Sequence, residues 1–201
     1  MHPRQQGRIL HPMDPSSLAH HLLIAMPQLD DPGFGQTVTY IIEHDDQGAM
    51  GLTLNRPLEH INLSRVLDSM KITPRVPVPD DAHPVVAGGP VNTQTGFILH
   101  PPCEQMWHST VVLQSGLWLT TSKDVLEAIA CGQGPSHSLI ALGYAGWEPG
   151  QLEQELVDNA WLTTPALPEM VFDVPFAERW HAAARLMGID LDLISTQAGH
   201  S

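Results

Sequence analysis

The chain has little cysteine and little positive charge, and both shortages exclude classes of protein. Its two cysteines, Cys103 and Cys131, are too few for a disulfide scaffold or a zinc finger, so we expect free thiols in a reducing compartment. Nine Lys and Arg residues stand against 22 Asp and Glu residues, which gives a net charge of −13. That charge repels phosphate backbones and argues against direct nucleic-acid binding.

Long hydrophobic runs are also missing. No window of about 18 apolar residues is present, so we expect no membrane-spanning helix. The first 17 residues contain no apolar run of about seven residues, so no signal peptide is visible and a cytoplasmic location is expected.

The composition that is present fits one folded domain. Of the 201 residues, 42% are hydrophobic and 15% are charged, which is typical of a globular protein with a sizeable core. We expect a loose polar leader over residues 1–17, a single domain over 18–195 and a polar tail over 196–201.

Short strands and scattered helices alternate along the chain, which predicts an α+β fold. Apolar residues at helical spacing predict one helix over 63–70, with Asn62 as its N-cap, and a second helix with Ser122 as its N-cap. Two more helices are expected, one with Pro149 in its first turn and a last one that opens at Pro175. Apolar and β-branched runs predict a central strand over 138–144 and further strands over 20–26, 37–42, 49–54, 85–87, 96–100, 109–113, 117–120, 161–163 and 170–172.

The twelve histidines do not show the spacing of metal ligands. His20 and His21, for example, point to opposite faces of a strand, and we expect no metal and no cofactor. No Gly-x-Ser-x-Gly motif is present. Cys103 lies close to His100 in the sequence, which leaves a Cys–His dyad open. An enzyme is therefore the less favoured interpretation.

Several strings resemble the AlgH/YqgE family of bacterial proteins. They occur in the family's order between residues 18 and 195, and together they are highly specific. The polar leader and the proline-rich stretch 74–79 depart from the family pattern without touching a motif. The matching strings are Leu23–Pro27, Glu43–Asp45, Gly48–Leu52, Leu54–Pro57, Gly88–Val91, Gly96–His100, Leu142–Trp147, Pro149–Glu153 and Asn159–Trp161.

The resemblance implies a mixed, bifurcated β-sheet that is curled into a pseudo-barrel and flanked by helices. It also implies a bacterial cytosolic protein from a family without an established enzymatic activity. The family's name comes from a proposed role in regulating alginate production, and its members are often described as transcriptional regulators.

The family's motifs place six candidate ligand- or partner-binding residues at strand ends and corners. We expect them to converge on one surface groove. In the alternative interpretation, Arg56 is structural and ties a loop through backbone carbonyls. The six candidates are Asn55, Arg56, Gly89, Pro90, Tyr144 and Trp147.

We therefore expect a non-enzymatic regulatory or interaction protein that acts through an unidentified protein or small-molecule partner. The first alternative is a small-molecule-binding or sensing domain, which a concave apolar pocket near Arg56 would support. The second alternative is a hydrolytic or thiol-based enzyme. It requires Cys103 or a carboxylate with a partner within hydrogen-bond reach.

Overall fold

Stretches rich in β-branched and aromatic residues form the strands of one sheet, as their composition predicts. The computed structural model describes residues 17–29 and 31–197, which form nine strands. Of the predicted leader, only Ser17 lies within the described residues. The strands are β1 (His21–Ala25), β2 (Val38–Asp45), β3 (Gly48–Thr53), β4 (Val85–Ala87), β5 (Val91–His100), β6 (Val111–Val112), β7 (Trp118–Thr120), β8 (Leu139–Trp147) and β9 (Trp161–Pro165).

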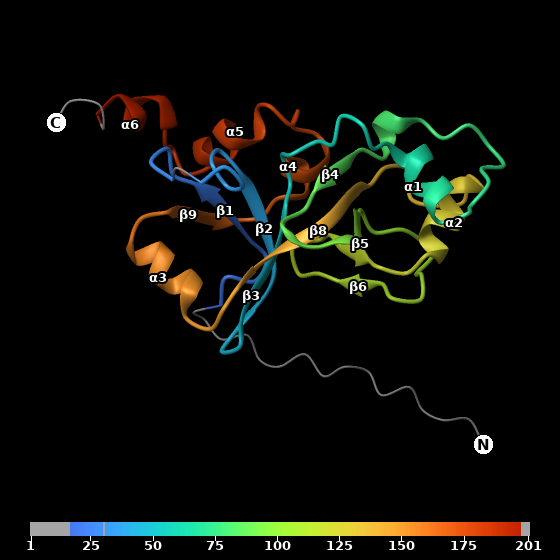
Figure 1. Cartoon of the computed structure of the whole chain (residues 1–201), viewed down its shortest axis with the longest axis horizontal. Helices are drawn as coiled ribbons and strands as arrows, with labels where there is room; N and C mark the ends of the chain where they lie inside the picture. The colour runs from blue at the N-terminus through green and yellow to red at the C-terminus, as the bar shows by residue number, and fades with distance from the viewer. Residues whose placement is uncertain (1–16, 30, 198–201) are drawn as a thin grey trace, which may run out of the picture.

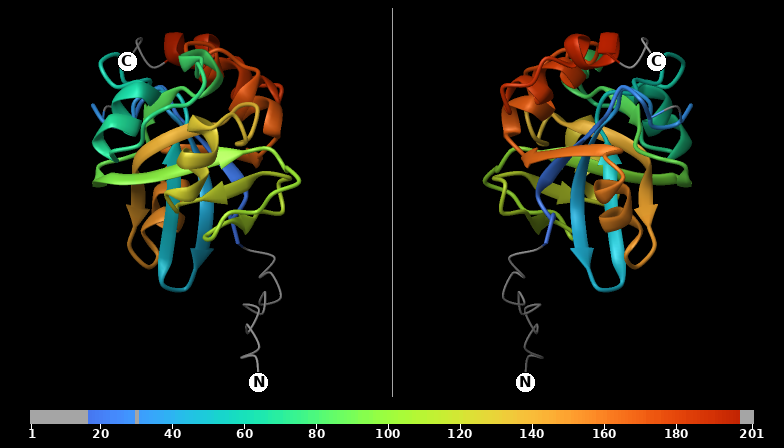
Figure 2. Two further views of the ribbon diagram at one scale, coloured as in Figure 1. Left: turned by 90° about the vertical axis from the view of Figure 1, so that its right-hand side faces the viewer. Right: turned by 90° about the vertical axis from the view of Figure 1, so that its left-hand side faces the viewer.

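The sheet is bifurcated and curled (Figure 1). Its strand order is β6-β7-β5-β8-β3-β2-β1-β9, and β4 pairs with β8 off this path. β8 pairs with β4 and β5 near its start and with β3 near its end, so it belongs to both branches. Only the β4–β8 pair among the described strands is parallel, which makes the sheet mixed. In Figure 2 the β2–β3 hairpin runs steeply across β5, and this crossing produces the curl.

Helices cover both faces of the sheet, which explains why short strands such as β1 are apolar on both sides. On β1, Leu22 and Ile24 pack into one core cluster, and Leu23 and Ala25 point the other way into another. The first cluster lies under α4 (Pro168–Phe172), α5 (Arg179–Arg185) and α6 (Leu191–Gln197), and the second under α3 (Gln151–Val157). A third cluster joins α1 (Leu63–Ser69) and α2 (Asp124–Ala130) to the other branch.

The α+β fold, the mixed, bifurcated sheet and the central position of residues 138–144 are confirmed. Asn62 is confirmed as the N-cap of α1, since its side chain accepts the Arg65 amide. None of the helices among the described residues is long and apolar enough to cross a membrane.

Four local predictions are wrong. Residues 170–172 belong to α4, because a three-residue apolar run fits a buried helix as well as a strand. Ser122 is not the N-cap of α2, because its hydroxyl donates to the Asp124 carboxylate and Lys123 occupies that position. Pro149 lies outside α3, since Gly150, with a φ of +77°, is the N-cap. The helix expected from Pro175 begins at Arg179 and is followed by α6. The predicted tail contributes its first two residues to α6, and residues 198–201 lie outside the described part of the chain.

Candidate functional site

Asn55 and Arg56 follow β3 and fasten the loop before β2 to the sheet. The Asn55 side chain accepts the Val38 amide at 2.9 Å and donates to the Gln36 carbonyl at 2.9 Å. The Arg56 guanidinium donates to the Gly35 carbonyl. Both side chains therefore bind backbone groups, which is the role that the structural interpretation of Arg56 predicts.

The loop and Arg56 also form a surface hollow of about 460 Å³. None of the ion pairs formed by the described residues includes Arg56, so most of its guanidinium N–H groups can donate to a partner. Asp31 lines the hollow as well, but its Oδ1 already accepts the amides of Gly33 and Phe34 at 2.7 and 3.1 Å. The lining residues are Pro27, Gln28, Leu29, Asp31, Pro32, Gly35, Gln36 and Arg56.

Gly89 lies where two backbone segments cross. Its φ is +155°, and a Cβ at this position would overlap the carbonyl group of Tyr144. Gly143 faces it with a φ of +74°, and a Cβ there would lie 2.6 Å from the Gly89 carbonyl oxygen. The crossing therefore requires glycine on both segments. Pro90 is exposed beside it, and the half-buried Tyr144 ring packs edge-on against Phe97 at 5.9 Å.

Trp147 lies in the core beneath α3, where it is only 7% exposed. Its indole Nε1 donates to Glu155 Oε2 at 2.9 Å, and Trp161 Nε1 donates to the same oxygen at 2.7 Å. Phe34 packs against both indole rings, at 6.3 and 5.8 Å between centroids. The Glu155 carboxylate of α3 thus links the last residue of β8 to the first residue of β9.

The six candidate residues do not line a single groove. The Arg56 carbonyl accepts the Ala87 amide at 2.8 Å, which places the Arg56 segment beside the strand that leads into Gly89 and Pro90. Trp147 lies apart from them, in the core, and of the six only Arg56 lines the hollow. Sequence motifs locate strand ends and corners, whereas the direction of each side chain depends on the pairing of distant strands.

Replacing Glu155 with alanine should lower the free energy of unfolding by about 3 kcal/mol, because two part-buried indole N–H groups lose a charged acceptor. Urea unfolding followed by tryptophan fluorescence measures the change. The control is Glu127→Ala, which removes an exposed ion pair with Lys123 and should cost about 0.5 kcal/mol. Equal losses in the two variants would contradict the argument.

Cys103 and His100 are neighbours in space, with 3.7 Å between Cys103 Sγ and His100 Nδ1. His100 is fully buried, and its Nδ1 donates to the Pro101 carbonyl at 2.9 Å while its Nε2 accepts the Thr120 hydroxyl at 2.9 Å. The nitrogen nearest the thiol therefore already carries a proton and cannot take one from it. Burial also raises the pKa of Cys103 and lowers the pKa of His100, so both groups are neutral at pH 7.

Three buried or half-buried histidines should make the protein less stable below pH 6.5. Burial lowers the pKa of His20, His83 and His100, and the charges of His21 and His137 lower the first two further. As the pH falls through 6.5, the unfolded chain takes up protons that the folded chain does not, and each histidine removes at most about 1.4 kcal/mol per pH unit. The pKa values of Glu153 and Asp124 are also lowered. These two groups reduce stability only in a separate, more acidic pH range, below their ordinary pKa values of 4.5 and 3.8.

Urea unfolding at a series of pH values measures this effect. The midpoint should fall steadily from pH 7 to pH 5.5, and His20→Gln should reduce the slope, whereas the exposed His108→Gln should leave it unchanged. A midpoint that stays flat over this range would show that the three imidazoles titrate alike in both states.

Arg179 was not among the sequence candidates, yet it is the most deeply buried cation of the described residues, with 3% exposure. The sequence nevertheless contains an indication that Arg179 is buried. Arg179 follows Phe176 by three residues and precedes Ala183 by four, which places it on the apolar face of its helix.

Comparisons with known proteins agree over nearly the whole chain. A family model described as AlgH-like matches residues 22–192. A UPF0301 protein of Alcanivorax borkumensis is 58% identical over 188 residues, covering 94% of this chain and 98% of that protein. The UPF0301 protein AlgH of Pseudomonas aeruginosa is 53% identical over 187 residues, covering 93% and 97%.

Two solved structures have a similar fold. The solution structure of the AlgH protein from Pseudomonas aeruginosa has a TM-score of 0.75 and 52% identity, covering 96% of this chain and all of that one. The crystal structure of protein DIP2367 from Corynebacterium diphtheriae has a TM-score of 0.68 at 22% identity, covering 92% and 94%, and supports the fold alone.

Proposed function

The chain belongs to the AlgH-like family, and from that premise we propose that it is a non-enzymatic regulatory or interaction protein. It acts in the bacterial cytosol by recognising a protein or small-molecule partner at the hollow beside Arg56. A part in transcriptional regulation, which the family resemblance implies, would then be indirect.

The observation that carries this proposal is the guanidinium of Arg56 in the wall of the 460 Å³ hollow. Its bond to the Gly35 carbonyl holds the group in place without using its charge. A planar guanidinium fixed in this way suits a carboxylate or carbonyl oxygen of a partner. The neighbouring Gln28 and Gln36 side chains are exposed and add amide donors and acceptors.

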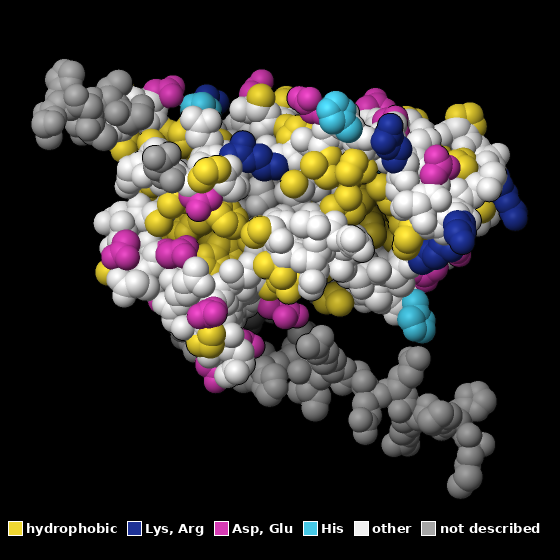
Figure 3. Space-filling view, viewed as in Figure 1, with side chains coloured by type: hydrophobic (Ala, Val, Ile, Leu, Met, Phe, Trp, Pro, Cys, Tyr) yellow, Lys and Arg dark blue, Asp and Glu magenta, His cyan; other side chains and the backbone are white. Residues whose placement is uncertain are grey.

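The distribution of charge supports a partner other than nucleic acid. On the face shown in Figure 3, acidic side chains lie over the end with α3 and the β2–β3 hairpin and along the upper edge, and several Lys and Arg side chains lie over the end with α1 and α2. The basic end is modest, since residues 56–75 hold four basic against two acidic groups. An overall charge of −13 opposes binding to a phosphate backbone.

Photo-crosslinking in the bacterial cell tests the proposal. A crosslinking amino acid at Gln28, in the lining of the hollow, should trap a defined partner, and Arg56→Gln should abolish the adduct. Crosslinking from the exposed Gln133 and the exposed substitution Arg75→Gln are the matched controls. An adduct that survives Arg56→Gln, or forms equally from residue 133, would refute recognition at this hollow.

A small-molecule partner at the same hollow has a test of its own. Fractionated low-mass cell extract would then raise the Tm of the wild-type protein and of Arg75→Gln but not that of Arg56→Gln. Equal shifts in all three proteins would place the ligand elsewhere on the chain.

A further inference from the structure

Arg179 is a buried cation that carbonyl groups hold in place. Its Nε donates to the Val174 carbonyl at 2.9 Å, its Nη2 to the Val171 carbonyl at 2.7 Å, and its Nη1 to the Leu54 carbonyl. None of the ion pairs among the described residues includes Arg179. Three of its five N–H groups are therefore used, and its charge has no carboxylate partner.

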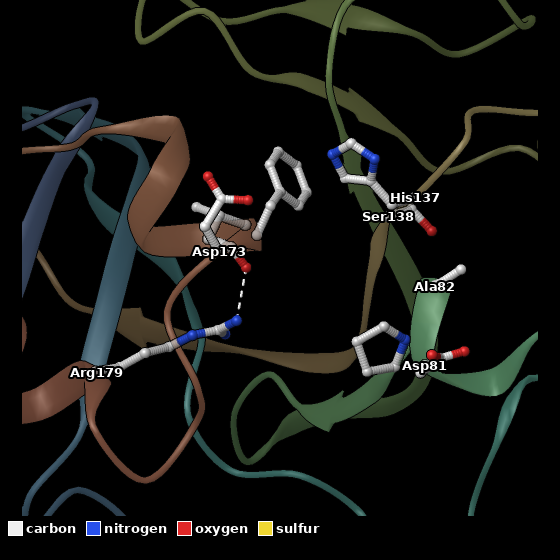
Figure 4. A pocket seen from close by; sticks show the side chains of 9 residues that line it. Asp81, Ala82, His137, Ser138, Asp173 and Arg179 are labelled. Atoms are coloured by element: carbon white, nitrogen blue, oxygen red, sulfur yellow. Dashed lines mark hydrogen bonds between the residues drawn. The ribbon is translucent and has the colours of Figure 1, made fainter.

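The guanidinium faces a cavity of about 140 Å³ between α4 and the segment that leads into β8. In Figure 4 the Arg179 side chain points into this cavity and the His137 ring stands on the opposite side. The carboxylates of Asp81 and Asp173 point away from Arg179 in the same view, so neither neutralises it. Arg179 is thus the only Lys or Arg in a lining that also includes Asp81 and Asp173, and the cavity has room for about four or five water-sized groups.

Apart from the two aspartates, the remaining walls are apolar or already engaged. Val171, Phe172 and Pro84 line the cavity, and the Phe172 ring packs edge-on against His137 at 4.9 Å. The Ser138 hydroxyl is bonded to His83 Nδ1 at 2.9 Å and points away from Arg179 in Figure 4. Ser138 therefore does not present a nucleophile to Arg179 across this cavity.

We propose that this cavity binds the carboxylate group of a small organic acid. The free N–H groups of Arg179 donate to the carboxylate, His137 supplies a second polar contact, and Phe172 and Pro84 pack against a short carbon chain. A bound carboxylate would supply the negative charge that this buried cation lacks, and the apolar walls favour an organic acid over a strongly hydrated inorganic ion. This site is distinct from the hollow at Arg56 and does not depend on the function proposed for it.

Titration of the wild-type protein with sodium propionate, followed by nuclear magnetic resonance of the ¹⁵N-labelled chain at constant ionic strength, tests the site. Saturable shifts are expected at the amides of Phe172, Asp173 and Ser138 and at the Arg179 Nε–H. Propionamide, which has the same shape and no charge, should leave these signals unchanged. The wild-type chain serves in both arms, so the result does not depend on a variant that fails to fold.

A matched pair of histidine variants then tests the second contact. His137→Ala should weaken propionate binding about tenfold, the effect of one lost hydrogen bond to a charged group. His108→Ala removes an exposed histidine outside the cavity and should leave binding unchanged. Shifts that grow linearly without saturation, equal shifts with propionamide, or saturation by inorganic phosphate but not propionate would each overturn the proposal.

Discussion

Replacing Gly89 with alanine should lower the free energy of unfolding by about 4 kcal/mol or more, at the upper end of what single substitutions do. The added Cβ would overlap the Tyr144 carbonyl and the Ala145 amide nitrogen, both of which are backbone groups that cannot rotate away. The φ of +155° adds strain for any side chain. Relief would require the segment before β5 to move away from β8, which pairs with three other strands.

Gly150→Ala is the matched control for this prediction. Gly150 also has a positive φ, +77°, but a Cβ there would meet nothing within 4 Å. Its substitution should therefore lower the free energy of unfolding only by the cost of the left-handed backbone conformation, about 1–2 kcal/mol. Urea unfolding of both variants measures the difference, and similar losses would mean that the crossing of the two segments can relax.

Replacing Arg179 with methionine should lower the free energy of unfolding by about 3–5 kcal/mol. The change leaves the carbonyls of Leu54, Val171 and Val174 without their donor in a buried setting. Methionine fills a similar volume, so the loss reports the polar contacts more than a cavity. Burial also lowers the pKa of Arg179 to about 10, which still leaves the group charged at pH 7.

Two further variants separate charge from geometry at this position. Arg179→Lys keeps the charge but can donate to fewer carbonyls. Its free energy of unfolding should therefore lie between those of Arg179→Met and the wild type. Arg185→Met, at an exposed position on the same helix, should change stability by no more than about 0.5 kcal/mol. An Arg179→Met variant as stable as Arg185→Met would show that the three carbonyls find other donors.

Local patterns in the sequence predicted most of the elements. The period of apolar residues identified α1 and α2, Asn62 marked the start of α1, and the most apolar run became the central strand β8. The family resemblance supplied the curl of the sheet, which no periodicity contains. The prediction failed at residues 170–172, where a run of three apolar residues is too short to distinguish a buried strand from a buried helix.

The candidate site was predicted in part. Motif positions located Arg56 and the Gly89 corner, but the hollow beside Arg56 depends on a loop that Asn55 holds from 19 residues away. Arg179 reaches the Leu54 carbonyl across 125 residues, and Trp180 reaches the Ala25 carbonyl across 155. Such contacts leave only a weak local signal in the spacing of residues.

Composition, charge and local period are properties of the sequence and of neighbouring residues, so the sequence by itself determined the α+β class, the family and the net charge of −13. Which polar side chains become buried, and which face a cavity, was decided by the tertiary structure, and the position of Arg179 on an apolar helix face was only a weak indication of its burial. The reason is physical: burial depends on strands and helices far apart in the chain closing over a side chain, and only the folded chain brings them together.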